Sequence, residues 1–169
     1  MPKTIGDLEE IGFEYVGQWN INQDNRIYFD IYPEYLNKEH LLYAFGVNET
    51  VKYIGITEKS LKARMINYKN GYEESKTSGT TNKKVHRAIK ELLISQKKVD
   101  IYLLKKDADC HFFGYQISLA TGIEKSLIKA FDFDNNLWNS RGTVLNNIES
   151  KQKIIKFYSN LEANQSVIV

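Results

Sequence analysis

The stretch LLYAFGVNETVKYIGIT, residues 41–57, constrains the fold more strongly than any other part of the chain. Its two arms, residues 41–47 and 51–56, are rich in β-branched and aromatic residues, which favour strands. The short turn Asn-Glu-Thr joins the arms, so the segment predicts a β-hairpin. Tyr43 and Tyr53 stand ten positions apart on the two arms, and the second arm contains the tripeptide Tyr-Ile-Gly.

Helical and strand patterns follow one another on both sides of this hairpin. Aromatic and β-branched runs predict strands, and apolar residues spaced along one helical face predict helices. Further strands are expected over residues 13–19, 26–32 and 99–105, and helices over 4–11, 60–70, 83–95, 117–131 and 144–161. Ser60 is the expected N-cap of its helix, and NGYEESKTSGTTN, residues 70–82, forms the least ordered loop.

This order of elements predicts an α+β fold, with a small antiparallel sheet of about three strands flanked by helices. The 169 residues are enough for one compact domain with a sizeable core. Within it we distinguish a strand-containing N-terminal extension, a central core, and a C-terminal helix with its tail. These three parts span residues 1–40, 41–142 and 143–169.

The composition excludes several classes of protein and site. Hydrophobic residues make up 42% and charged residues 26% of the chain, as in ordinary soluble globular proteins. There is no run of about 18 apolar residues that predicts a membrane span. MPKTIGDLEE has no signal-peptide h-region, so we expect a cytoplasmic protein without a membrane partner. The single cysteine, Cys110, excludes an internal disulfide and cysteine-based zinc sites, and His40, His86 and His111 lack metal-ligand spacing.

Charge is distributed unevenly along the chain. Residues 1–58 carry four Lys and Arg against ten Asp and Glu, a net charge of −6. Residues 59–90 carry nine against two, a net charge of +7. A basic block of this kind indicates a polyanionic partner, because Lys and Arg release counterions from phosphates when they bind. The alternative is a solvated helical face, which a run of charges by itself does not exclude.

Four polar residues outside the hairpin complete a distinctive pattern. Arg64 lies eleven residues after Tyr53, and Tyr68 lies four further, on the same face of the predicted helix. Glu124 sits among apolar neighbours in the helix over residues 117–131, and Asn139 follows fifteen residues later. Taken singly, each residue has an ordinary explanation: a core tyrosine, a solvated charge or a turn asparagine.

Taken in order, these motifs and residues resemble the GIY-YIG nuclease family. They are the tripeptides LLY and YIG, the Arg and Tyr four residues apart, and the Glu and Asn. The resemblance covers roughly residues 41–142. Within the family, VKYIGIT, LKARMINYKN and SLATGIEKSLIKAF are similar to two compact groups, the coliphage endonuclease II type and the small Hpy-type type II restriction endonucleases. Leu41 stands where the motif has glycine; since the chemistry belongs to the tyrosine, we interpret this as a difference in packing.

The resemblance implies a role for each motif residue on the hairpin and the following helix. Tyr43 would be the general base that takes a proton from the attacking water, which requires that nearby cations lower its pKa or that the proton passes concertedly. Arg64 would contact the scissile phosphate and stabilise its growing charge. Tyr53 and Tyr68 would hold the phosphate or the water. Gly55 would let the hairpin backbone approach the helix of Arg64 closely.

The resemblance also implies a metal site and a second support. Glu124 would bind a single Mg²⁺, for which Mn²⁺ substitutes, because Mg²⁺ often uses one or two carboxylates and keeps several waters. Asn139 would brace the site or the phosphate. The basic block and nearby polar residues would follow the DNA backbone. The residues expected to bind DNA are Lys62, Lys69, Lys76, Lys83, Lys84, His86, Arg87 and Arg141.

The implied function is that of a divalent-metal-dependent endonuclease. It would cut double-stranded DNA at a specific site, as a type II restriction endonuclease does, and leave 5′-phosphate and 3′-hydroxyl ends. A less selective nuclease from a phage or mobile element is the alternative, and a catalytically inactive DNA-binding module is a more distant one. A generic α/β domain with accidental matches is the remaining alternative. Cutting both strands suits a homodimer or homotetramer, because a two-fold axis supplies two active sites.

Overall fold

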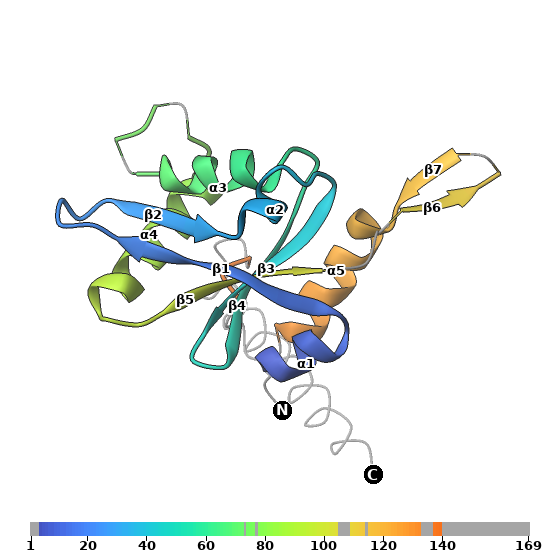
Figure 1. Cartoon of the computed structure of the whole chain (residues 1–169), viewed down its shortest axis with the longest axis horizontal. Helices are drawn as coiled ribbons and strands as arrows, with labels where there is room; N and C mark the ends of the chain where they lie inside the picture. The colour runs from blue at the N-terminus through green and yellow to red at the C-terminus, as the bar shows by residue number, and fades with distance from the viewer. Residues whose placement is uncertain are drawn as a thin grey trace, which may run out of the picture. The chain divides into compact units, whose positions relative to one another are not determined.

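The computed structural model describes residues 4–72, 74–76, 78–104, 109–113, 115–132 and 137–139, all within one compact unit, residues 1–139 (Figure 1). The helices are α1 (Ile5–Glu10), α2 (Pro33–Leu36), α3 (Leu61–Lys69), α4 (Thr80–Ile94) and α5 (Leu119–Phe131). The strands are β1 (Phe13–Ile21), β2 (Ile27–Ile31), β3 (Leu41–Val47), β4 (Thr50–Thr57), β5 (Val99–Leu104), β6 (Asp109–Phe112) and β7 (Tyr115–Ser118). None of the described helices has the length and apolar character needed to span a membrane.

The main sheet has five antiparallel strands in the order β2-β1-β5-β3-β4, and β6 pairs with β7 in a separate two-stranded sheet. The α+β class is confirmed, but the expected number of about three strands is wrong. β1 pairs with β5 from Phe13 opposite Leu104 to Trp19 opposite Val99, and β2 pairs with β1. The strands assigned to an N-terminal extension therefore belong to the same sheet as the hairpin. Every residue of β5 is buried or half-buried, which suits a central position in the sheet.

Helices cover both faces of the sheet around the hairpin, and the core has two corresponding clusters. Alternate residues of β3 point to opposite faces, so Tyr43 and Phe45 join one cluster and Leu42 and Ala44 join the other. The first cluster contains residues of α3 and α4, among them Met65. The second contains residues of α1 and α5. The hairpin is therefore buried between two layers of helices, and side chains on α3 and α5 reach it from opposite faces.

The predicted hairpin is present, with a turn one residue shorter than the predicted Asn-Glu-Thr because Thr50 belongs to β4. Val47 pairs with Thr50 across a two-residue turn, and the two turn residues, Asn48 and Glu49, have φ of 45° and 63°. Positive φ at both positions is typical of the type I′ turn, whose twist matches that of the flanking strands. Ser60 is the N-cap of α3, because its hydroxyl accepts a hydrogen bond of 3.2 Å from the backbone N–H of Ala63.

Several elements differ from those expected. α4 begins at Thr80, three residues before the predicted start, and α2, β6 and β7 were not predicted. Pro33 ended the expected strand pattern, but it also occupies the first turn of α2, where its missing N–H costs nothing. The helix predicted over residues 144–161 lies outside the described residues.

Candidate active site

Three tyrosine hydroxyls meet beneath α3. Tyr43 comes from β3, Tyr53 from β4 and Tyr68 from α3, and all three side chains are buried. The hydroxyl oxygens of Tyr43 and Tyr68 lie 2.6 Å apart, and the Tyr68 hydroxyl donates to that of Tyr53 over 2.9 Å. Each phenol has one proton, so with the Tyr68 proton directed at Tyr53, the Tyr43 hydroxyl is the donor to Tyr68. No described residue accepts the proton of Tyr53.

Arg64 covers this cluster with its guanidinium group. Its Nε–H donates to the Tyr43 hydroxyl over 2.8 Å, and its Cζ lies 4.6 Å from the centre of the Tyr68 ring. Among the described residues Nε makes the only hydrogen bond of this side chain, so both Nη groups are available. Arg64 and Asn67 line an open hollow of about 370 Å³ together with residues 56–59. The guanidinium thus lies between the phenols and the surface.

The protonation of the cluster follows from its burial. Burial raises the pKa of Tyr43, and this effect outweighs the opposing influence of Arg64. Burial likewise raises the pKa of Tyr68 well above its ordinary value. Burial disfavours the charged form of Arg64, but the tyrosine oxygens reverse this effect, and its pKa lies above its ordinary value. Arg64 acts to lower the pKa of Tyr43 as one of the two implied routes requires, but burial outweighs it, which favours the concerted route.

Gly55 leaves room for two of the tyrosine rings. It pairs with Tyr43 across the hairpin. A Cβ at Gly55 would lie 2.7 Å from Oη of Tyr43, 2.8 Å from its Cζ and 2.7 Å from Cε1 of Tyr53. The role expected from the sequence, close approach of the backbone to α3, stays a prediction, and the nearest atoms to such a Cβ belong to the two tyrosine rings. Without a side chain at Gly55, the two rings occupy the space above the strand.

Glu124 reaches the site from α5, on the other side of β4. Its carboxylate is half-buried, accepts a hydrogen bond from the backbone of Ile56 and feels the charge of Arg64. Burial raises the pKa of Glu124, although Ile56, Arg64 and Lys125 each act to lower it. Ile56 also lines the hollow beside Arg64, so the carboxylate and the guanidinium lie at the same end of β4.

Asn139 hydrogen-bonds to the open edge of β4, next to Glu124. Its Oδ1 accepts from the backbone N–H of Ile54 over 2.9 Å, and its Nδ2 donates to the backbone carbonyl of the same residue. The backbone N–H of Trp138 donates to the carbonyl of Lys52 over 2.6 Å. Since alternate residues of an edge strand present their backbone groups outward, residues 52, 54 and 56 are bound in turn by Trp138, Asn139 and Glu124. Asn139 therefore braces the strand that carries Tyr53.

The residues expected to contact DNA divide into groups. Lys62, Lys69, Lys76 and Arg87 are exposed, Lys83 and Lys84 are half-buried, and Arg141 lies outside the described residues. His86 is buried, and its Nδ1 lies 2.9 Å from the backbone carbonyl of Tyr68. Lys69 and His86 line one hollow together with Arg26 and Lys90, which the sequence did not single out. Lys90 could have been found from its i+4 spacing to His86, whereas nothing local marks Arg26.

The carboxylate of Glu124 suits a hydrated magnesium ion better than a fully protein-bound metal. Among the described residues no group of three or more His, Cys, Asp or Glu side chains could enclose a cation. A single desolvated carboxylate leaves most ligand positions to water and substrate oxygens, which Mg²⁺ prefers. The residues present therefore fit the metal that the sequence implied.

Comparison with known proteins places this geometry in a known fold. A glutamate-to-alanine mutant of bacteriophage T4 EndoII matches with a TM-score of 0.63 and 22% identity, over 77% of this chain and 96% of that one. Restriction endonuclease Hpy188I, solved in complex with product DNA, matches with a TM-score of 0.52 and 22% identity, over 78% of this chain and 83% of that one. The chain has the GIY-YIG nuclease fold.

The GIY-YIG fold confirms the resemblance read from the motifs. No protein-family model matches the chain, and neither does any curated protein. The two solved structures thus establish the fold, and both are nucleases of this type. In this chain the fold brings side chains of β3, α3 and α5 to one end of β4.

Proposed function

We propose that the chain is a divalent-metal-dependent endonuclease that hydrolyses phosphodiester bonds of double-stranded DNA at a specific site, leaving 5′-phosphate and 3′-hydroxyl ends. The observation that carries this proposal is the hydrogen-bonded cluster of Tyr43, Tyr53, Arg64 and Tyr68, with Glu124 beside it at the end of β4. Its fold is that of two endonucleases, one of them a restriction enzyme solved with product DNA.

Arg64 connects the phosphate to the proposed base. Arg64 lines the hollow together with residues 56–59, while its Nε donates to the Tyr43 hydroxyl over 2.8 Å. A guanidinium presents several donors in a fixed plane, so the same group can contact a phosphate oxygen and keep its bond to a phenol. Arg64 would then place the phosphorus next to Tyr43 and stabilise the charge that develops on the phosphate oxygens.

Tyr43 would act as the base within a chain of three hydroxyls. Because burial raises the pKa of Tyr43, its neutral phenol is favoured over a phenolate formed before the water arrives. It can accept the water's proton on its oxygen as it passes its own proton to Tyr68, and Tyr68 passes one to Tyr53. The last proton would pass from the Tyr53 hydroxyl to a solvent water, so the proton taken from the attacking water is balanced by one released to solvent. No phenol becomes fully charged in this sequence.

Glu124 would hold the metal, and Asn139 would fix the strand edge to which Glu124 is hydrogen-bonded. A Mg²⁺ ion bound there would supply stabilisation of negative charge on the leaving 3′ oxygen. The Ile56 backbone hydrogen-bonds to the carboxylate, which has further lone pairs with which it would bind a cation. Asn139 holds Ile54, two residues before Ile56, and so fixes the strand edge on which Glu124 rests.

The proposal is tested by cleavage of supercoiled plasmid with Mg²⁺ or Mn²⁺. We expect the wild-type chain to convert the plasmid to cut forms, and Glu124→Ala to bind DNA without cutting it. Glu10→Gln, which removes an exposed carboxylate at the end of α1, is the matched control and should cut normally. If wild type and Glu124→Ala both bind DNA and neither cuts with either metal, the catalytic assignment is wrong and a DNA-binding module is the better description.

A less selective phage-type nuclease is the second candidate. It is favoured by the match to T4 EndoII, which has the higher TM-score of the two and spans 96% of that protein. Run-off sequencing of the cut ends separates the two: one repeated short sequence indicates a restriction enzyme, and varied ends indicate the phage type. Sedimentation with and without DNA tests the expected homodimer or homotetramer, and a monomer in both conditions would contradict it.

A further inference from the structure

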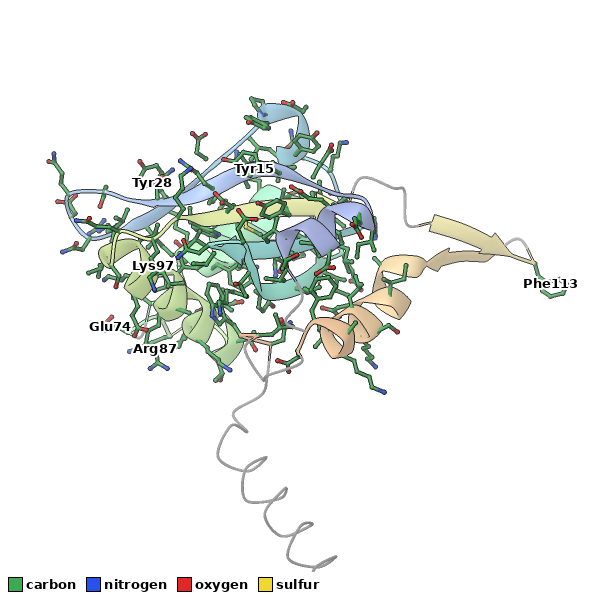
Figure 2. All side chains as sticks on the ribbon, turned by 90° about the horizontal axis from the view of Figure 1, so that it is seen from below. Tyr15, Tyr28, Glu74, Arg87, Lys97 and Phe113 are labelled. Carbon is green, nitrogen blue, oxygen red and sulfur yellow. The ribbon has the colours of Figure 1, made fainter. Side chains whose placement is uncertain are left out.

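A second open hollow lies at the C-terminal end of α3. It has a volume of about 440 Å³ and shares no lining residue with the hollow beside Arg64. The turn between β1 and β2, the end of α3 and the middle of α4 meet there. An adjoining hollow of about 330 Å³ shares Tyr72, Glu74, His86 and Lys90 with it, so the depression continues along α4, where Figure 2 shows Glu74 and Arg87.

Cations outnumber acids around this hollow. Arg26, Lys69 and Lys90 line it from the β1–β2 turn, α3 and α4, and Glu74 is the one acidic lining residue among those that the structure describes. Within the part of the chain that the structure describes, no hydrogen bond or ion pair engages the charged ends of these three cations. Uncompensated cations that converge from separate elements favour an anionic ligand.

His86 gives the hollow a buried polar group. Its side chain is only 9% exposed, and its Nδ1 lies 2.9 Å from the backbone carbonyl of Tyr68. A carbonyl oxygen only accepts, so Nδ1 has the proton and the tautomer is fixed. Nε2 has no hydrogen-bond partner among the described residues, and the ring lines the hollow. A protonated His86 would present a second N–H to an anion there.

We propose that this hollow is a second phosphate site, which holds a DNA backbone phosphate other than the scissile one. The inference rests on the proposed function, since it takes DNA to be the substrate. Arg26, Lys69 and Lys90 supply charge around the site, and a protonated His86 would donate a hydrogen bond from Nε2 at its floor. The ring of Tyr72, which is 50% exposed and lies at the edge of His86, is placed to contact the adjoining sugar or base.

The site is joined to the proposed catalytic residues through α3. His86 binds the carbonyl of Tyr68, whose hydroxyl belongs to the tyrosine cluster. Lys69, the last residue of α3, lines the hollow, five residues after Arg64, which is about 8 Å along a helix axis. A phosphate held here would therefore fix the C-terminal end of the helix that positions Arg64 and Tyr68.

The first test follows the His86 ring by NMR in the full chain with EDTA present, so that binding is measured without cleavage. The sequence has three histidines, and His40 and His111 serve as internal controls. The probes are a short DNA duplex, a deoxynucleoside monophosphate and inorganic phosphate. We expect the duplex to shift the His86 Nε2 resonance and to leave that of His40 in place, with the two small probes acting only at much higher concentration.

The second test measures duplex affinity by fluorescence anisotropy, again without metal. Lys90→Gln and Arg26→Gln each remove one cation from the hollow, and Lys97→Gln removes an exposed cation that lines neither hollow (Figure 2). Each hollow variant should weaken binding by about tenfold at low salt and reduce the slope of log affinity against log salt by about one, as expected for one lost phosphate contact. Lys97→Gln should leave the slope unchanged.

The outcomes separate this inference from the proposed function. If the duplex binds and His86 does not shift, or if Lys97→Gln equals the hollow variants, the phosphate site is wrong while the nuclease stands. If the monophosphate shifts His86 at lower concentration than the duplex, the hollow binds a free nucleotide and the assignment to the DNA backbone is wrong. If the wild-type chain binds no duplex at all, the proposed function fails together with the site.

Discussion

The two sides of β4 contribute to the candidate site by different means. On the side of α3, the phenols of Tyr43, Tyr53 and Tyr68 are buried and hydrogen-bonded to one another. At the open edge, Glu124 and Asn139 attach through backbone groups of the strand itself. The first half is therefore fixed by core packing and the second by edge hydrogen bonds. Substitutions in the tyrosine cluster should therefore lower stability and activity together. Substitutions at the strand edge can lower activity without an equal loss of stability.

Glu124→Gln should show this separation most strongly. The amide keeps an oxygen that accepts from the Ile56 backbone but loses the charge that would hold a metal. We expect plasmid cleavage to fall by about 1,000-fold, the scale on which a single electrostatic group acts in catalysis. The urea midpoint should stay close to that of the wild type. Lys125→Ala, an exposed neighbour on α5, is the control that should retain cleavage.

Gly55→Ala should have the opposite profile, with a large loss of stability. The added Cβ would lie 2.7 Å from both Tyr43 Oη and Tyr53 Cε1, and aromatic rings in a packed core cannot easily move aside. We expect the free energy of unfolding to fall by about 3 kcal/mol, with loss of cleavage. Gly122→Ala on α5 is the matched control: nothing lies within 4 Å of a Cβ there. It should stabilise the helix by about 0.5–1 kcal/mol, and equal effects of the two substitutions would contradict the comparison.

Tyr68→Phe tests the hydrogen bonds of the cluster without adding volume. Its hydroxyl accepts from Tyr43 and donates to Tyr53, so its removal leaves the buried Tyr43 proton without an acceptor. A buried unsatisfied donor costs about 2 kcal/mol, and the proposed proton chain is broken, so cleavage should fall as well. Tyr35→Phe removes a hydroxyl that binds Glu14 at the surface and should have a smaller effect on urea unfolding. If Tyr68→Phe cleaves at the wild-type rate, Tyr43 does not pass its proton through Tyr68.

The contrast between local packing and non-local edge contacts also decides how much of the molecule could be predicted from sequence. The hairpin, α3 and its Ser60 cap follow from local periodicity and turn chemistry. That Tyr43, Tyr53, Arg64 and Tyr68 belong together was implied by the family resemblance, and their hydroxyl and guanidinium groups do meet. Local patterns give no strand order, so the addition of β1 and β2 to β5 was missed and the sheet was predicted too small.

Non-local contacts also explain what was missed within the site. The bond between Asn139 and Ile54 joins positions 85 residues apart, and no spacing rule specifies it. The sequence indicated Arg64 as the cation beside Tyr43, but it could not show that Tyr43 is completely buried. Burial raises the pKa of Tyr43 by more than Arg64 lowers it, so the net direction could not be predicted. Arg26 reaches the second hollow only because β2 lies near α3 and α4.

Asn139→Ala should loosen the edge of β4 with a smaller effect on global stability. The freed backbone groups of Ile54 can bind water at an edge, so we expect a loss of about 1 kcal/mol. Hydrogen exchange of the Ile54 amide should become faster, because its acceptor is gone. Asn139→Asp keeps the acceptor and loses the donor, so it should preserve protection of this amide. Equal exchange in both variants would show that the side chain does not hold the strand.

The smallest expected effect is the pH dependence that Glu124 gives to stability. Burial raises the pKa of Glu124 above the ordinary 4.5, so folding favours the protonated carboxyl. Its contribution to stability is full below pH 4.5 and is lost as the pH rises through the raised pKa of the folded state. Asp100, whose pKa burial also raises, acts in the same direction, so the wild type must be compared with Glu124→Gln at each pH. As the pH rises across that window, the difference in their free energies of unfolding should shift in favour of the variant. Adding Mg²⁺ should shift it back toward the wild type, because a bound cation stabilises the ionised carboxylate.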